Sequence, residues 1–240
     1  MRIAIVSDVH GNRRAFEAVL ADLREVAPDR VVHGGDLAAG GSHPAEIVDQ
    51  IRSLGWPGVC GNTDEMLRDP EQLTEFAATL PPLARVFGMV GDAIPWTVAQ
   101  LGEERLRWLA ALPREFVHEG FRLVHASPGD LWRCPAPGAG EEELRRVYGG
   151  LGVGIVVHAH VHVPYVRKFE GLIVANTGSV SQSHDGDTRA SYLLMDGDEL
   201  AIRRVVYDVG AAAEDVARCG VPHGDWMAKI LLAGRYVAPE

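Results

Sequence analysis

The chain contains 240 residues, of which 47% are hydrophobic and 23% charged, and its formal net charge is −10. This length and this apolar fraction suffice for one sizeable α/β domain. The acidic balance argues against a protein that coats nucleic acid or lies on a membrane surface, because both tasks need a basic surface. It does not exclude an anionic substrate, since cations bound in a site can locally outweigh the global charge.

The three cysteines, Cys60, Cys134 and Cys219, are widely spaced and form no Cys-x-x-Cys pair. The spacing therefore indicates neither a disulfide framework nor a thiolate zinc site, and a reducing compartment fits. We find no basic-then-apolar signal segment and no apolar run of membrane-spanning length. The sequence thus predicts a cytoplasmic protein.

The first sixty residues alternate between short apolar runs and segments with helical periodicity. The run 3–6 is continuously apolar and ends at a turn, which is typical of a buried strand in an α/β sheet. Pro28 closes the helix that follows, and Pro44 suits the first turn of the next helix. These features predict a β-α-β-α-β order over the segments 3–6, 16–26, 31–32, 44–54 and 58–60.

Residues 65–111 are mostly helical in pattern, with interruptions at Pro81-Pro82 and at 91–95, and could include a partial lid. A hairpin is predicted around Glu119-Gly120, between strands at 116–117 and 121–124. The remaining expected elements are a short helix through Tyr148, strands at 155–157, 165–169, 172–175, 191–195 and 199–207, and helices at 211–219 and 225–232. Because no linker or break in composition divides the chain, we expect one domain over residues 1–240.

Polar side chains follow the first strand directly. Asp8 and His10 come where the apolar run 3–6 ends, and in open α/β sheets the chemistry lies beyond the carboxyl ends of such strands. Positions two apart on an extended backbone point the same way, so both side chains can reach one metal ion. Taken alone, this Asp-x-His pair is a weak signal.

The same kind of residue follows the later strands. The polar side chains at the strand ends are Asp8, His10, Asp36, Asn62, His125, His160, His162 and Asn176. They are oxygen and nitrogen ligands of borderline or hard divalent cations, with no thiolate among them. They are too many for one tetrahedral ion and suit two ions that share a carboxylate, an arrangement that favours in-line displacement at phosphorus.

These motifs, in this order, resemble the calcineurin-like metallophosphoesterase family, and most closely its small prokaryotic phosphodiesterases. The resemblance covers residues 8–180, and six motifs in order make chance agreement remote. The matching motifs are Asp8-x-His10-Gly-Asn12, Gly35-Asp36, Gly61-Asn62-x-Asp64, His125-x-Ser-Pro, His160-x-His162-x-Pro164 and Asn176-x-Gly-Ser-Val180.

The resemblance implies a fold and a metal centre. The expected fold is an α/β sandwich of two mixed β-sheets flanked by helices, in four α-β-β-α layers. The family pattern assigns Asp8, His10 and His162 to one ion, Asn62, His125 and His160 to a second ion, and Asp36 to both. The ions could be Mn, Fe, Zn, Ni or Co. A hydroxide between the ions would attack phosphorus, and Asn62 or Asn12 could also touch the phosphate of a phosphate-ester substrate.

The sequence departs from the family pattern at a position that matters for catalysis. Many members have Gly-Asn-His-Asp where this chain has Gly61-Asn62-Thr63-Asp64, and they use that histidine to protonate the leaving group. Without it, substrates with good leaving groups should be favoured, unless His33, His158 or His184 replaces it.

Some polar residues near the motifs have plainer interpretations. We interpret His158 and His33 as core histidines inside strands. Asp64 could orient a ligand imidazole or be a carboxylate at a helix N-terminus. The segment 176–179 is expected to be a structural loop beside the site.

The sequence as a whole predicts a metal-dependent phosphoesterase that hydrolyses diesters in preference to monoesters, with no catalytic residue assigned beyond the ligands. Two alternatives stay open: a phosphomonoesterase, and a scaffold subunit of the same fold that binds protein partners and barely hydrolyses anything. The sequence identifies neither the physiological substrate nor the oligomeric state.

Overall fold

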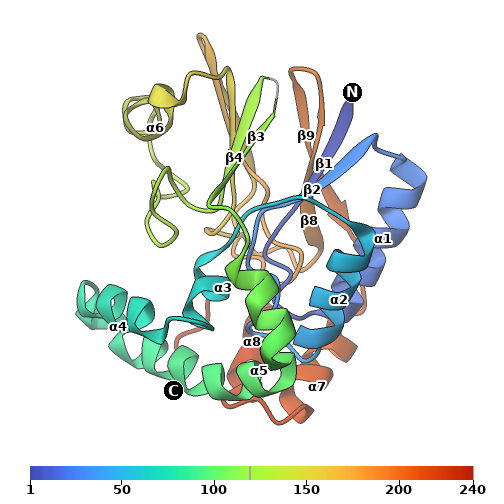
Figure 1. The fold of residues 1–240 in the computed structure, drawn as a ribbon, viewed down its shortest axis with the longest axis vertical. Coiled ribbons are helices and arrows are strands. Elements are labelled where there is room, and N and C mark those ends of the chain that lie inside the picture. The colour runs from blue at the N-terminus through green and yellow to red at the C-terminus, as the bar shows by residue number, and fades with distance from the viewer. Residues whose placement is uncertain (119, 240) are drawn as a thin grey trace.

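The computed structural model describes residues 1–118 and 120–239, and two β-sheets lie stacked between helices in this structure (Figure 1). The first sheet has the order β2-β1-β8-β9, with β1 (Arg2–Val6), β2 (Arg30–His33), β8 (Ala190–Asp196) and β9 (Glu199–Val205). The second has the order β3-β4-β5-β7-β6, with β3 (Glu115–His118), β4 (Phe121–Val124), β5 (Ile155–His158), β6 (Tyr165–Phe169) and β7 (Leu172–Asn176).

Both sheets are mixed. In the first, β1 runs parallel to β2 and antiparallel to β8, which pairs antiparallel with β9. In the second, β4, β5 and β7 are mutually parallel, and the edge strands β3 and β6 are antiparallel to their neighbours. The predicted fold class of two mixed sheets flanked by helices is therefore confirmed.

Side-chain alternation along each strand builds the layers. In β1, Ile3 and Ile5 pack between the two sheets with residues such as Val157 of β5. Ala4 and Val6 point to the opposite face and pack with the helical layer. Because both faces of β1 are covered, its sequence is continuously apolar rather than alternating.

Helices cover the outer faces of the sandwich. The first sheet is covered by α1 (Arg13–Val26) and α2 (Pro44–Leu54), and the second by α6 (Glu141–Tyr148), on opposite sides of the sandwich in Figure 1. The side chain of Asn12 caps α1 by accepting a hydrogen bond from the Ala15 N–H at 3.1 Å.

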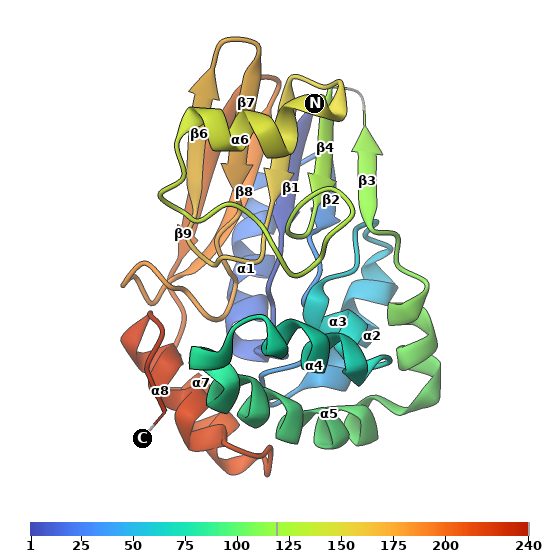
Figure 2. The same cartoon turned by 90° about the vertical axis from the view of Figure 1, so that its left-hand side faces the viewer.

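The remaining helices gather at the end of the sandwich toward which the parallel strands run (Figure 2). They are α3 (Asn62–Met66), α4 (Pro70–Ala78), α5 (Ala84–Ala110), α7 (Val209–Arg218) and α8 (Gly224–Ala233), with a short 3₁₀ turn at Pro81–Leu83. A second 3₁₀ turn, Gly149–Leu151, follows α6. Within the two described ranges, none of the helices has the length and apolarity needed to cross a membrane. This helical end faces the loops that carry the predicted ligands.

Two expectations from the sequence are wrong. The segment 58–60 forms a single bridge between Gly58 and His33 instead of a strand. The chain leaves the sheet at Cys60, because the N–H of Cys60 donates to Pro113 O at 2.8 Å and not to a strand. The expected interruption at 91–95 is also absent, since α5 continues through Pro95. The real break in α5 lies at Gly102, whose φ of 68° glycine adopts readily.

Other predicted elements are confirmed. The expected hairpin exists as the antiparallel pair β3 and β4, although Glu119 of its predicted turn lies outside the described residues. The expected pair of C-terminal helices corresponds to α7 and α8. The single-domain organisation over 1–240, and a lid role for helices in 65–111, stay predictions.

His33 makes the stability of the fold sensitive to acid. The side chain is fully buried beside Trp108, and neither ring nitrogen has a hydrogen-bond partner. Burial lowers the pKa of His33 to about 4. The unfolded chain takes up a proton at this histidine below pH about 6.5, whereas the folded protein does not until about pH 4. Stability should therefore fall as pH drops through this window, by about 3 kcal/mol from this residue.

We expect His33→Leu to flatten this part of the pH dependence while leaving stability at pH 7 equal or higher, because an unpaired buried polar ring is removed. Urea unfolding between pH 4 and 7, with chelator present for both proteins, measures this difference. An unchanged slope in the variant would contradict the assignment to His33.

Candidate metal centre

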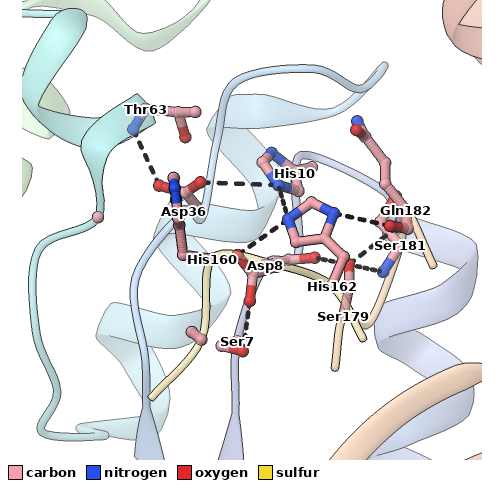
Figure 3. Close-up of polar contacts among 12 residues, drawn as sticks. Ser7, Asp8, His10, Asp36, Thr63, His160, His162, Ser179, Ser181 and Gln182 are labelled. Atoms are coloured by element: carbon pink, nitrogen blue, oxygen red, sulfur yellow. Dashed lines mark hydrogen bonds and ion pairs between the residues drawn. The ribbon is translucent and has the colours of Figure 1, made fainter. Parts of the chain in front are cut away.

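The predicted ligands come together at one end of the sandwich. Each follows a strand or opens the helix after it, because the parallel strands all deliver their carboxyl ends to this edge. Asp8 follows β1, Asp36 follows β2, His125 follows β4, and His160 and His162 lie in the loop after β5, while Asn62 is the first residue of α3. Figure 3 shows how the side chains of Asp8, His10, Asp36 and His162, from separate loops, approach one another.

The backbone at these positions is strained. Of the seven non-glycine residues with a positive φ in the described part of the chain, five are predicted ligands. They are Asp8 (55°), His10 (48°), Asp36 (55°), His160 (71°) and His162 (57°). A residue held in such a conformation is destabilising by about 1–3 kcal/mol, and such residues cluster at functional sites. Their concentration here indicates that the loops are built to aim these side chains.

Four of the side chains form a compact candidate metal-binding group. One ligand atom from each of Asp8, His10, Asp36 and His162 lies within 4.8 Å of the others. His162 Nε2 is 3.1 Å from Asp8 Oδ1 and 3.3 Å from His10 Nε2. His10 Nε2 is 3.7 Å from Asp36 Oδ2. All four residues are buried.

Asn62, His125 and His160 form a second group next to the first. The Oδ1 atom of Asn62 lies 2.9 Å from both His125 Nε2 and His160 Nδ1. His125 Nε2 is also 3.5 Å from the Oδ1 atom of Asp36, whose other oxygen faces His10. Asp36 is therefore the carboxylate that lies between the two groups.

Three imidazoles are oriented in the same way, each by an Nδ1–H that donates to a backbone carbonyl at 2.7 Å: His10 to Ala39, His125 to Gly34 and His162 to Gln182. In the neutral ring the other nitrogen, Nε2, then carries a lone pair and faces the cluster. The Nε2 atoms of His10 and His162 thus bring two lone pairs within 3.3 Å of each other. A bound cation relieves that repulsion, so the donor set fits a metal ion.

The charges in the cluster depend on one another. Burial by itself would raise the pKa of Asp8, but the nearby His162 holds it below its usual value. Burial would lower the pKa of His162, but the negative charge of Asp8 outweighs it and raises this pKa. The pKa of His125 is raised in the same way, by the charge of Asp36 acting against burial. Burial lowers the pKa of His160 to about 4. The cluster thus favours buried positive charge beside its carboxylates.

Asp64 supports the loop that carries Asp36. Its carboxylate accepts hydrogen bonds from the N–H groups of Asp36 (2.8 Å), Leu37 (3.0 Å) and Gly61 (3.0 Å). Burial, and then the charge of Asp36, raise the pKa of Asp64 to about 6. Of its two predicted roles, the structure therefore shows the carboxylate at a helix N-terminus, since these oxygens hold backbone amides rather than an imidazole. Gly61 is required here, because a Cβ atom would clash with the Asp36 carboxylate.

Several neighbouring residues have structural partners instead. His158 Nε2 lies 2.6 Å from the hydroxyl oxygen of Tyr165, and burial lowers the pKa of His158 to about 3. Asn176 donates to Ala159 O at 2.6 Å within the loop beside the site. Of the histidines considered as replacement acids, His184 lies beside the cluster, with its ring centroid 4.7 Å from that of His162.

The side chain of Asn12 is already engaged, because it caps α1 and its Nδ2 donates to Ser181 Oγ at 3.1 Å. Contact between Asn12 and substrate stays a prediction.

Sequence reasoning missed two residues at the site, Ser7 and Gln182, and the contacts of a third, Thr63. The Ser7 hydroxyl is fully buried and donates to Asp8 Oδ2 at 2.6 Å, and its place directly before Asp8 was the available signal. The backbone of Gln182 orients His162, but nothing in the sequence marks it. Thr63 donates its N–H to Asp36 Oδ1 at 2.9 Å, while its buried Oγ1 has no hydrogen-bond partner.

A buried cluster of aspartates, histidines and an asparagine at the strand ends of a two-sheet sandwich defines a metallophosphoesterase-type protein. The sequence model of the calcineurin-like phosphoesterase superfamily domain matches residues 1–200. The chain therefore belongs to the calcineurin-like phosphoesterase superfamily.

Relatives agree with this assignment. The chain is 30% identical to an uncharacterized protein of Methanocaldococcus jannaschii, over 97% of this chain and 98% of the relative. It is 26% identical to a probable metallophosphoesterase of Methanothermobacter thermautotrophicus, over 83% of this chain and 89% of the relative. Among solved structures, a metallophosphoesterase from Sphaerobacter thermophilus superposes with a TM-score of 0.79 at 28% identity, covering 98% of this chain and 100% of that one. A hypothetical protein from Pyrococcus horikoshii OT3 shares the fold, with a TM-score of 0.84 at 18% identity. The superposition covers 98% of this chain and 99% of that one.

Proposed function

We propose that this protein is a phosphodiesterase that works with two divalent metal ions. The observation that carries the proposal is the inward-facing lone pairs of the anchored imidazoles, arranged in two groups around Asp36. With both rings neutral, the facing Nε2 atoms of His10 and His162 have no donor between them, and a cation bound there would accept both lone pairs.

The residues divide between the two ions as follows. Asp8, His10 and His162 would hold one ion, Asn62, His125 and His160 the other, and Asp36 would contact both. When bound, the ions would supply a water of lowered pKa as nucleophile and would neutralise charge on the phosphoryl group. The chain itself fixes the ligand orientations through backbone carbonyls, and Asn62 could in addition contact the phosphate.

The surroundings of the cluster favour a diester over a monoester. A cavity that opens next to His10 is lined, among the described residues, by no arginine, lysine or carboxylate. A diester carries one negative charge, whereas a monoester at neutral pH carries about two and would benefit from an additional cationic side chain. The three free cysteines are compatible with a cytoplasmic location, which stays a proposal.

Two substrates with the same leaving group test this proposal. After chelation and reloading with manganese, we expect kcat/KM for methyl p-nitrophenyl phosphate to exceed that for p-nitrophenyl phosphate about tenfold or more, equivalent to about 1.4 kcal/mol of transition-state binding. Elemental analysis of the protein as purified identifies the metals and their number.

Other outcomes decide between the alternatives. Faster cleavage of the monoester would indicate a phosphomonoesterase and contradict the diester preference. Protein that binds manganese and hydrolyses neither compound would support the scaffold alternative instead.

A further inference from the structure

A cavity of about 100 Å³ lies between the metal-ligand cluster and the helical end of the molecule. His10 and Thr63 border it on the side of the cluster, and helices α5 and α8 supply most of its remaining wall. The α4, α5 and α8 helices lie together below the strand ends in Figure 2. We call this space the helix pocket and define it by His10, Thr63, Val90, Ile94, Met227 and Ile230.

The wall of the helix pocket is apolar in chemistry. Ile94 and Met227 are buried, and Val90 and Ile230 add aliphatic side chains from the same two helices. The polar side chains of its wall are engaged elsewhere: Thr97 Oγ1 donates to Ala93 O at 3.1 Å, Trp226 Nε1 to Val237 O at 2.8 Å and Gln182 Nε2 to Gly40 O at 3.3 Å. This part of the wall can therefore make van der Waals contacts with a ligand, whereas its side-chain donors already hydrogen-bond to backbone carbonyls.

Polarity changes abruptly at the mouth of the pocket. The Oγ1 atom of Thr63 is buried and has no hydrogen-bond partner, although the N–H of the same residue is fixed on Asp36. A buried hydroxyl without a hydrogen-bond partner is destabilising, so a ligand atom that hydrogen-bonds to Thr63 Oγ1 would be stabilising. A ligand with a polar oxygen at Thr63 and an apolar group beyond it would match both halves of this space.

The size of the pocket limits that apolar group. An engineered cavity of about 150 Å³ lined by apolar side chains accepts benzene. The helix pocket is smaller than this, at about 100 Å³. A short alkyl chain therefore matches the size and the apolar wall of this pocket better than a polar nucleoside or sugar does.

We propose that the helix pocket binds the second ester group of the phosphodiester substrate, and that this group is a short uncharged alkyl chain. The phosphate would lie at the metal-ligand cluster, with one of its oxygens accepting a hydrogen bond from Thr63 Oγ1, and the alkyl chain would extend between α5 and α8. The inference rests on the proposed function, because the cluster must bind the phosphate for the pocket to select the ester.

Two diester analogues with the same charge and the same poor leaving group, methoxide, test the pocket through their initial binding. Methyl methylphosphonate and methyl butylphosphonate differ by three methylene groups, and each is titrated calorimetrically into the manganese-loaded protein. Burial of those groups should make the butyl compound bind about 10- to 50-fold more tightly. Equal affinity of the two compounds would overturn the pocket assignment while leaving the phosphodiesterase proposal intact. Binding of neither compound would instead count against the proposed function.

Val90→Phe fills the pocket and should remove most of the butyl preference while leaving methyl methylphosphonate binding unchanged. Val98→Phe is the matched control, since Val98 lies on the same helix but outside the pocket wall and should keep the full preference. Ile230→Ala enlarges the pocket and should improve the affinity for methyl phenylphosphonate relative to the butyl compound. A butyl preference that survives Val90→Phe, or no gain for the phenyl compound in Ile230→Ala, would contradict the assignment.

Discussion

Replacing Asp36 with asparagine is expected to reduce phosphodiester hydrolysis by a hundredfold or more. Substituting a residue that only supports metal ligands reduces activity by about 10- to 100-fold, and substituting a ligand itself should cost at least the upper value. The Asp36 oxygens lie 3.7 Å from His10 Nε2 and 3.5 Å from His125 Nε2, on opposite sides of the same carboxylate. No other predicted ligand faces both groups in this way within the described residues. The asparagine side chain would keep the shape of Asp36 and remove the charge that the proposed cations would need.

Two measurements check this expectation. Turnover of methyl p-nitrophenyl phosphate gives the loss in activity, and elemental analysis gives the metal content, which should fall with it. Asp198→Asn is the matched control, because Asp198 is exposed in the turn between β8 and β9 and should leave both values unchanged. The double variant Asp36→Ala, His125→Ala should likewise lose activity without unfolding. Full turnover in either site variant would refute the proposed mechanism.

Asp64→Ala is expected to lower the free energy of unfolding by about 3 kcal/mol or more, because it leaves three backbone N–H groups without their acceptor in a buried site. The Asp64 side chain is 2% exposed, and its carboxylate holds the amides of Asp36, Leu37 and Gly61. Loss of these bonds should also release the loop that keeps Asp36 at a φ of 55°. Activity should therefore fall together with stability.

Urea unfolding of the chelated protein measures the loss without a contribution from bound metal. Asp64→Asn keeps one acceptor oxygen and should give an intermediate value. Asp198→Ala removes an exposed carboxylate in the turn between β8 and β9 and should change stability by less than about 0.5 kcal/mol. Equal stability of Asp64→Ala and the unsubstituted protein would show that these amides find other partners.

The sequence by itself, through its resemblance to a known family, predicted the two-sheet architecture, and its motifs named the candidate ligands. The apolar run of β1 marks a strand covered on both faces, and the polar residues that follow each strand mark the edge where a site forms. These signals are local, since they depend on side-chain type within a few residues, so Asp8, His10 and Asp36 could be named without coordinates. Local signals failed at Pro95, where packing of the buried residues Ala93 and Ile94 keeps the helix continuous.

Only the tertiary structure decided which nitrogen of each imidazole faces the cluster, because Ala39, Gly34 and Gln182 are far from their histidine partners in sequence. The helix pocket is likewise a product of long-range packing, since Thr63, Ile94 and Ile230 come from three helices that no periodicity places together. A sequence pattern reports the character of one element at a time, whereas the distance between two elements depends on how all the others pack.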